Sequence, residues 1–408
     1  MEITSIITYI LFFITLYAEV FILLSFLEGY SATEAAEPNT LPKIAPSVAI
    51  IVPCFNEEKT VRGTIESLLA SDYPKEKLSI IVVDDGSKDA TYAQALSITD
   101  PRLQVFKKEN GGKFTAMNFA LSKTDADIIG CLDADSFVDP HAITASVAHM
   151  TQTKSVAVTP AIIVEKPQNL LQLAQRVEYS MGIFIRRAFS AAGTIFITPG
   201  PLSLFNRAVI LELGGWRHAH GTEDLEMGLR LQERRYKITN TPRARVLTKT
   251  PDTLYKLYKQ RVRWSYGFLM NAFDYRFMFF RRKYGALGMV VFPAALASIF
   301  ITLYFCGLIM YSIADTVIQA YVRYSILGFH WHIPHLELFF VNTTPISLMS
   351  LFMTSLALVF LAIGKTLSKT EFSIIHVPLY FFSFFVFTPI WLTGALIRAS
   401  MRAQAPWR

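Results

Sequence analysis

Cysteine is scarce in this chain and widely scattered. Cys54, Cys131 and Cys306 are the three cysteines among 408 residues, and no two of them have the spacing of a metal-binding pair. The sequence therefore excludes a disulfide framework, and nothing in it indicates an oxidising compartment. Cys54 and Cys131 fall within apolar runs, which is typical of buried structural cysteines.

Charged residues are also few. They make up 17% of the chain, against 52% hydrophobic residues, and the mean hydropathy is +0.35. This composition excludes an ordinary soluble protein, yet it is too polar for a chain that lies wholly within a membrane. The net charge is +7, and basic residues gather beside apolar segments, as at Arg281, Arg282 and Lys283. Such clustering is typical of the positive-inside bias of membrane proteins, so we predict no nucleic-acid partner.

Apolar runs that are long enough to cross a bilayer occupy both ends of the chain. Residues 3–27 form the first run, and no Lys or Arg precedes it, which disfavours a cleaved signal peptide. Three further candidate spans lie at residues 287–311, 346–363 and 377–397. The predicted divisions are an N-terminal anchor (1–30), a proline-containing linker (31–46), a globular unit (47–250), an amphipathic stretch (251–286) and a membrane region (287–408).

The sequence leaves open the side of the membrane on which the chain ends. If the globular unit is cytoplasmic, three later spans put Arg398, Arg402 and Arg408 outside, against the positive-inside tendency. Pro389 within the last run would allow a broken or re-entrant helix that returns the end inward. Glu19, inside the first run, is undecided between a contact with another helix and a place near the interface.

The globular unit alternates apolar runs with helical stretches. Residues 48–52, 80–83 and 128–132 are continuous apolar runs, which suit parallel strands buried on both faces. Helical patterns separate these runs, at residues 60–70, 90–98 and 113–122. The pattern predicts a doubly wound α/β sheet flanked by transmembrane helices. Amphipathic helices that lie in the membrane interface are predicted at residues 170–187 and 254–282.

Polar clusters follow all three predicted strands. Ligands bind beyond the carboxyl ends of parallel strands, so these clusters mark one candidate site. Asp133 and Asp135 follow the third strand, where carboxylate oxygens suit a divalent cation that neutralises a diphosphate. Asp85 follows the second strand and could bind a nucleoside or simply form a turn. Lys113, after two glycines at a helix start, could meet a phosphate or merely begin the helix.

Two later segments carry further candidates: the interpretations of the first are evenly balanced, and the second is by itself more typical of a structural role. Thr222, Glu223 and Asp224 fit a helix cap with acids in its first turn, and Asp224 also fits a general base. Residues 260–264, with the sequence Gln-Arg-Val-Arg-Trp, fit a basic helix on a membrane surface. The order and spacing of these elements, over roughly residues 48–269, resemble the processive family 2 glycosyltransferases. That family includes cellulose, chitin, hyaluronan and poly-N-acetylglucosamine synthases.

The resemblance implies a role for each matching residue. Asp133 would lie near the ribose and diphosphate, and Asp135 would ligate Mg²⁺ or Mn²⁺. Asp224 would be the base of a single inverting displacement, with Glu223 as the next candidate. The donor would be held at the nucleoside by Pro53, Phe55, Asn56, Glu57 and Asp85, at the diphosphate by Lys113, and at the diphosphate and acceptor end by Gln260, Arg263 and Trp264.

The resemblance also implies an activity and a location. We expect a multi-pass protein of the plasma membrane whose cytoplasmic catalytic domain, in contact with membrane lipid, moves a sugar from a UDP-sugar onto a growing polysaccharide. N-acetylglucosamine or a related hexose is the expected sugar. The alternative is a non-processive enzyme that adds one sugar to a lipid-linked or cell-envelope acceptor. A catalytically dead sensor would be expected to lack the base or a metal carboxylate, and all of these are present.

Three features depart from the family pattern or stand outside it. Residues 198–202, Thr-Pro-Gly-Pro-Leu, replace the small-residue acceptor segment of the polymer synthases, and the F-x-V-T-x-K gating loop of cellulose synthases is missing. Both departures bear on the acceptor and on processivity. A histidine group at His330, His332 and His335 could suggest a metal site, but it lies in an aromatic loop and its one nearby carboxylate is Glu337.

Overall fold

The computed structural model describes residues 3–33, 41–328 and 344–401. The histidine group at 330–335 lies outside these residues. The strands are β1 (Val48–Cys54), β2 (Leu78–Asp84), β3 (Leu103–Lys107), β4 (Ile128–Cys131), β5 (Ser136–Val138), β6 (Ala157–Val164), β7 (Ser203–Asn206) and β8 (Ile238–Thr248). The helices of the globular unit are α2 (Val61–Leu69), α3 (Thr91–Leu96), α4 (Lys113–Leu121), α5 (Ala142–Thr153), α6 (Leu170–Ala191), α7 (Arg207–Glu212), α8 (Glu223–Glu233) and α9 (Leu254–Asp274).

All eight strands join one sheet in the order β3-β2-β1-β4-β7-β6-β8-β5. The pairings among β3, β2, β1 and β4 are parallel, which confirms the predicted α/β class. The sheet as a whole is mixed, because β7 is antiparallel to both of its neighbours and β5 is antiparallel to β8. The chain runs outward from β1 to β2 and β3, then crosses to β4 on the other side of β1. That reversal creates a crevice at the carboxyl ends of β1 and β4.

The continuous apolar runs are explained by helices on both faces of the sheet. Successive side chains of a strand point to opposite faces, and β1 is buried along its whole length. Ile50 packs on one face, in the cluster that includes α2 and α5, whereas Ile51 packs on the other, in the cluster that includes α4 and α8. Burial on both faces fixes the ends of β1 and β4, and these ends position the site.

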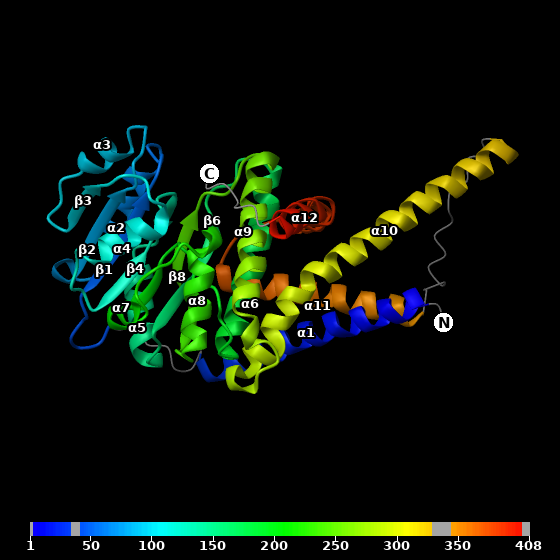
Figure 1. Ribbon diagram of the computed structural model, residues 1–408, viewed down its shortest axis with the longest axis horizontal. Coiled ribbons are helices and arrows are strands. Elements are labelled where there is room, and N and C mark those ends of the chain that lie inside the picture. The colour runs from blue at the N-terminus through cyan, green and yellow to red at the C-terminus, as the bar shows by residue number, and fades with distance from the viewer. Residues whose placement is uncertain (1–2, 34–40, 329–343, 402–408) are drawn as a thin grey trace.

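Within the described residues, four helices are long and apolar enough to cross a membrane. They are α1 (Ile3–Thr33), a helix that continues from a π-helical turn at Leu287–Val291 into α10 (Phe292–Leu327), α11 (Pro345–Ser368) and α12 (His376–Ser400). A helix therefore occupies each of the four predicted spans, and α12 continues through Pro389 without a break. Figure 1 shows α1 and α11 side by side, α10 diverging from them, and α12 seen nearly end-on, so that α12 runs crosswise to α1 and α11.

Helix α6 joins the globular unit to these helices. The Phe184 ring packs against Phe26 of α1 and Phe360 of α11, with ring centroids 5.0 and 4.6 Å apart. On the opposite side, α9 packs against α12 so closely that a methyl group on Gly394 would lie 2.6 Å from the Tyr258 hydroxyl oxygen. The two predicted amphipathic helices therefore form the junction between the sheet and the apolar helices.

The second amphipathic helix is shorter than predicted. The sequence pattern extends it to residue 282, but α9 ends at Asp274 and short 3-10 turns follow at Arg276–Met278 and Arg282–Tyr284. Phe280 adopts a left-handed φ of 56°, which a helix does not tolerate, and its amide donates to the carbonyl of Gly288. The basic and aromatic composition continues past the helix, so periodicity alone could not locate its end.

Candidate active site

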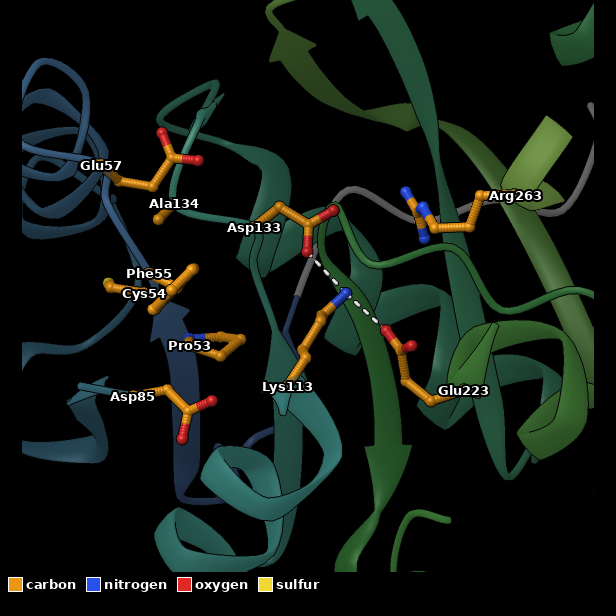
Figure 2. Close-up of a pocket in the computed structure, with 10 residues that line it drawn as sticks. All are labelled: Pro53, Cys54, Phe55, Glu57, Asp85, Lys113, Asp133, Ala134, Glu223 and Arg263. Atoms are coloured by element: carbon orange, nitrogen blue, oxygen red, sulfur yellow. Dashed lines mark ion pairs between the residues drawn. The ribbon is translucent and has the colours of Figure 1, made fainter. Parts of the chain in front are cut away.

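A pocket opens at the crevice between β1 and β4. Figure 2 shows Lys113 between Asp133 and Glu223, with Arg263 across from them and Asp85 set apart below Pro53. The cavity has a volume of about 100 Å³. Eight of the predicted site residues line it, namely Pro53, Phe55, Glu57, Asp85, Lys113, Asp133, Glu223 and Arg263, and Cys54 and Ala134 complete the lining. The pocket is therefore formed where three strand ends meet the starts of α4 and α8 and the side of α9. The polar clusters after the strands predict this convergence.

Lys113 forms the electrostatic centre of the pocket. Its Nζ lies 2.7 Å from Oδ1 of Asp133 and 2.7 Å from Oε1 of Glu223. Burial alone would lower the pKa of Lys113, but the two carboxylates outweigh burial and hold that pKa well above its ordinary value. A permanently charged amine therefore stands at the start of α4, where backbone N–H groups also favour an anion.

Asp85 has a supporting role that the sequence did not predict. Its buried carboxylate accepts hydrogen bonds from the backbone N–H groups of Gly111, at 3.1 Å, and Gly112, at 2.8 Å. Lys108 pairs with the same carboxylate at 2.5 Å. Gly112 has a φ of 91°, a conformation that a side chain would strain. Asp85 therefore holds the glycine turn that places Lys113.

The loop after β1 is braced from outside the pocket. Asn56 has a left-handed φ of 55°, and its amide oxygen accepts from the backbone N–H of Lys88 at 3.0 Å. Its own N–H donates to the Ser87 hydroxyl at 2.9 Å. Asn56 lies outside the pocket lining, so it links this loop to the loop after β2, while Phe55 and Glu57 line the pocket.

Asp135 also lies outside the lining of the pocket. It sits in the turn between β4 and β5, with its hydroxyl neighbour Ser136 at 3.4 Å from Oδ1. In the ranges that the structure describes, no three His, Cys, Asp or Glu side chains group closely enough to hold a metal ion. The two carboxylates of Asp133 and Asp135 still fit Mg²⁺ or Mn²⁺, because Mg²⁺ is commonly bound by one or two carboxylates together with substrate phosphates.

The predicted helix cap at Thr222 does not form. Helix α8 begins at Glu223, but the Thr222 side chain makes no capping hydrogen bond to it. The hydroxyl donates to the carbonyl of Ala219 at 3.1 Å and accepts from the Asn271 amide at 3.0 Å. Thr222 therefore ties the start of α8 to α9. The acids of the first turn remain, and the Asp224 carboxylate accepts a hydrogen bond there from the backbone N–H of Leu225 at 2.9 Å.

Asp224 and Glu223 have different electrostatic environments. Glu223 is paired with Lys113. Burial raises the pKa of Asp224 from 3.8 to about 6, and the Glu223 carboxylate adds to this while Lys113 opposes it. A carboxylate with a pKa near 6 is a better proton acceptor at neutral pH than an ordinary aspartate. The sequence ranks Asp224 above Glu223 as the base, and the structure gives the two acids different places: Glu223 lines the pocket, whereas Asp224 lies outside its lining.

Helix α9 presents three predicted residues at i, i+3 and i+4, which share one helical face. Arg263 donates from Nη1 to the carbonyl of Gly221 at 3.0 Å and lines the pocket. The Gln260 side-chain oxygen is buried and has no hydrogen-bond partner among the described residues. Trp264 lies outside the lining, and the Arg261 guanidinium stacks 4.7 Å from the Trp264 ring centroid. Of the three, Arg263 alone reaches the pocket.

Sequence reasoning missed two residues at the site. Thr198 bonds to the carbonyl of Asp224, and Gly200 packs against the carboxylate of Asp133. Both belong to the segment 198–202, which stood out only as a departure from the family pattern. A glycine between two prolines was the available signal, since such a segment is stiff and allows close approach at one point.

The comparisons with known proteins agree with this geometry. Residues 49–214 match the model of the family described as Glycosyl transferase family 2. Over this segment the match agrees with the resemblance that the motifs predict. The match ends before α8 and α9, which carry Asp224 and Arg263.

Two curated relatives extend the likeness. The chain is 32% identical over 226 residues to the poly-beta-1,6-N-acetyl-D-glucosamine synthase of Staphylococcus aureus strain COL. It is 32% identical over 232 residues to the protein of the same name from Staphylococcus epidermidis. Each alignment covers 54% of this chain and 54% of the relative, so the chain spans about half the length of these relatives.

One solved structure resembles nearly the whole chain. It is the mannosyltransferase PcManGT from Pyrobaculum calidifontis, solved in complex with GDP-Man and Mn²⁺, at a TM-score of 0.54 and 18% identity. The likeness covers 97% of this chain and 99% of that one. At this level of identity it shows the fold alone, a mixed α/β domain combined with apolar helices.

Proposed function

We propose that this chain is a membrane-bound inverting glycosyltransferase that moves N-acetylglucosamine or a related hexose from a UDP-sugar onto a growing polysaccharide. The proposal is carried by the two ion pairs that Lys113 makes with Asp133 and Glu223, in the pocket that Arg263 also lines. The pocket at the strand ends thus holds two cations, Lys113 and Arg263, and two carboxylates. Asp224, whose pKa is raised, follows Glu223 directly in the chain. The likeness to poly-N-acetylglucosamine synthases supports the choice of donor.

The chemistry follows from these side chains. An acceptor hydroxyl attacks the anomeric carbon, the bond from that carbon to the diphosphate oxygen breaks, and UDP leaves with the electron pair. Asp224 takes the proton from the acceptor hydroxyl. Lys113 and Arg263 offset the charge on the diphosphate, and Asp133 and Asp135 would hold Mg²⁺ or Mn²⁺, which supplies further neutralisation.

The pocket must open when the donor binds. A cavity of about 100 Å³ is smaller than the roughly 300 Å³ at the low end of ligand pockets. Lys113 closes the centre through its two ion pairs. A diphosphate is a stronger competitor for this amine than either carboxylate alone, so donor binding would draw Lys113 from one partner.

The proposal also includes the remaining predicted contacts. The nucleoside would be contacted by Pro53, Phe55, Asn56 and Glu57, and the acceptor end by Gln260 and Trp264.

The location follows from the charges. The catalytic domain would face the cytoplasm, because UDP-sugars are made there and because Arg281, Arg282 and Lys283 flank the second apolar helix. Membrane lipid would surround the apolar helices, and a glycan would be the acceptor.

A product assay tests the proposal. Purified protein in detergent is offered a panel of nucleotide sugars with Mg²⁺, and the products are sized. Polymer from UDP-N-acetylglucosamine supports the proposal. Addition of one sugar to a lipid-linked acceptor supports the non-processive alternative instead, and transfer from no nucleotide sugar contradicts both.

A further inference from the structure

The segment between α6 and β7 contacts Asp133, which lines the pocket, and Asp224, the proposed base just outside the lining. Thr198 is buried, and its backbone N–H and hydroxyl both donate to the carbonyl of Asp224, at 3.1 and 2.8 Å. Two residues later, Gly200 lies against the carboxylate of Asp133. A methyl group placed on Gly200 would be 2.5 Å from Oδ2 and 2.6 Å from Oδ1. Real Cβ atoms essentially never lie so close, so with any other residue at 200 something must shift, and the Asp133 carboxylate, as the end of a side chain, is the group that yields most easily.

The segment is itself held firmly. Pro199 and Pro201 flank Gly200 and restrict its neighbours' backbone. The Ser203 hydroxyl at the start of β7 donates to the carbonyl of Pro199 at 2.6 Å. Because β7 pairs with β4, which ends just before Asp133, the segment is anchored to the same strand that carries that carboxylate.

We infer that residues 198–200 form a rigid spacer that sets the distance between Asp133, on the donor side, and Asp224, on the acceptor side. Thr198 and Gly200 are thus positioning residues, which act through the two aspartates. The catalytic role of this spacer rests on the proposed function. In that function an in-line displacement requires the base and the leaving group to be held on opposite sides of the reacting carbon. The geometric claim stands apart from that function.

Gly200→Ala tests the donor side of the spacer, in full-length protein in detergent. The displaced Asp133 would leave Lys113, so labelling of Lys113 by a small amine reagent, followed by peptide mass spectrometry, should become about fivefold faster. Gly182→Ala is the matched control, because a methyl group there meets nothing within 4 Å, and its labelling should equal that of the unmodified protein. An unchanged Lys113 rate in Gly200→Ala would overturn the donor half of the inference.

Thr198→Val tests the acceptor side and does not depend on the glycine variant folding. It removes one hydrogen bond to the Asp224 carbonyl, so kcat should fall about tenfold with the donor KM nearly unchanged. Amide exchange at the start of α8 should also become faster. Thr198→Ser, which keeps the hydroxyl, should restore both. Thr194→Val is the control, since its buried hydroxyl bonds to the carbonyl of Phe189, away from the pocket.

The outcomes separate the spacer from the proposed function. Full kcat and unchanged exchange in Thr198→Val would overturn the acceptor half. If the unmodified protein transfers no sugar, the proposed function fails, while the Lys113 labelling and the amide exchange still decide whether the spacer exists.

Discussion

Replacing Asp224 by Asn separates proton transfer from structural support. The Asp224 carboxylate accepts from the N–H of Leu225 at 2.9 Å, and an amide oxygen can accept the same bond. The two bonds from Thr198 reach the backbone carbonyl, which the substitution leaves in place. Asn cannot accept a proton at neutral pH. Since base catalysis contributes about 10²–10⁴-fold, kcat should fall at least about a hundredfold.

The same substitution should make the protein more stable. The folded pKa of about 6 lies above the ordinary value of 3.8, so the folded chain binds the proton more tightly than the unfolded chain. The ionised carboxylate therefore costs stability progressively as the pH rises through this window, and the cost is complete above it. Removing the charge should raise the free energy of unfolding at pH 7 by roughly 1 to 3 kcal/mol. A purely structural Asp224 would give the opposite sign.

Sugar transfer and thermal unfolding are measured together on purified protein. In the unmodified enzyme, kcat should rise with pH and level off above about pH 6, because the base must be ionised. Glu223→Gln is the control at the adjacent position: it removes a partner of Lys113, so it should act mainly on donor binding. If Asp224→Asn keeps more than about a tenth of the activity, Asp224 is not the base. Lost donor binding would place it in the diphosphate site.

Three further predictions concern the metal, the pocket cation and the membrane. EDTA should abolish transfer and Mg²⁺ or Mn²⁺ should restore it, whereas full turnover in chelator would remove Asp133 and Asp135 from this role. Arg263→Lys loses the planar fork, so the donor KM should rise about tenfold with kcat changed little; an unchanged KM would exclude a diphosphate contact. A cysteine at Lys283 should resist impermeant thiol reagents in intact cells, where the native cysteines are buried. Ready labelling would invert the topology.

The fold, and the edge of the sheet that carries the site, could be predicted from the sequence because both depend on local patterns. Continuous apolar runs located β1, β2 and β4, and polar residues after them located Asp133 and Lys113. Contacts between distant segments could not be read in this way. One example is the hydrogen bond from Asn271 to Thr222, and another is the contact of Gly200 with Asp133. In both, no local sequence pattern indicates that the two residues meet.

Individual side-chain roles were harder to predict than their neighbourhood. Five of the predicted residues belong to the right segments but lie outside the pocket lining, namely Asn56, Asp135, Asp224, Gln260 and Trp264. A motif fixes which residues are near one another, whereas side-chain direction depends on tertiary partners such as Lys88 for Asn56. Asp224 shows the same limit, because its raised pKa arises from burial that the sequence does not display.

The crosswise direction of α12 bears on how the chain finishes its path through the membrane. If α1 and α11 run along the bilayer normal, a helix that lies across them (Figure 1), packed against α6 and α9, would not carry its far end to the opposite surface of the bilayer. With three crossings instead of four, the chain would begin outside and finish on the catalytic side. Arg398, near the end of α12, would then share the cytoplasmic side with Lys283. The positive-inside tendency would be obeyed without any break at Pro389, and a cysteine at Ser400 should label as one at Lys283 does.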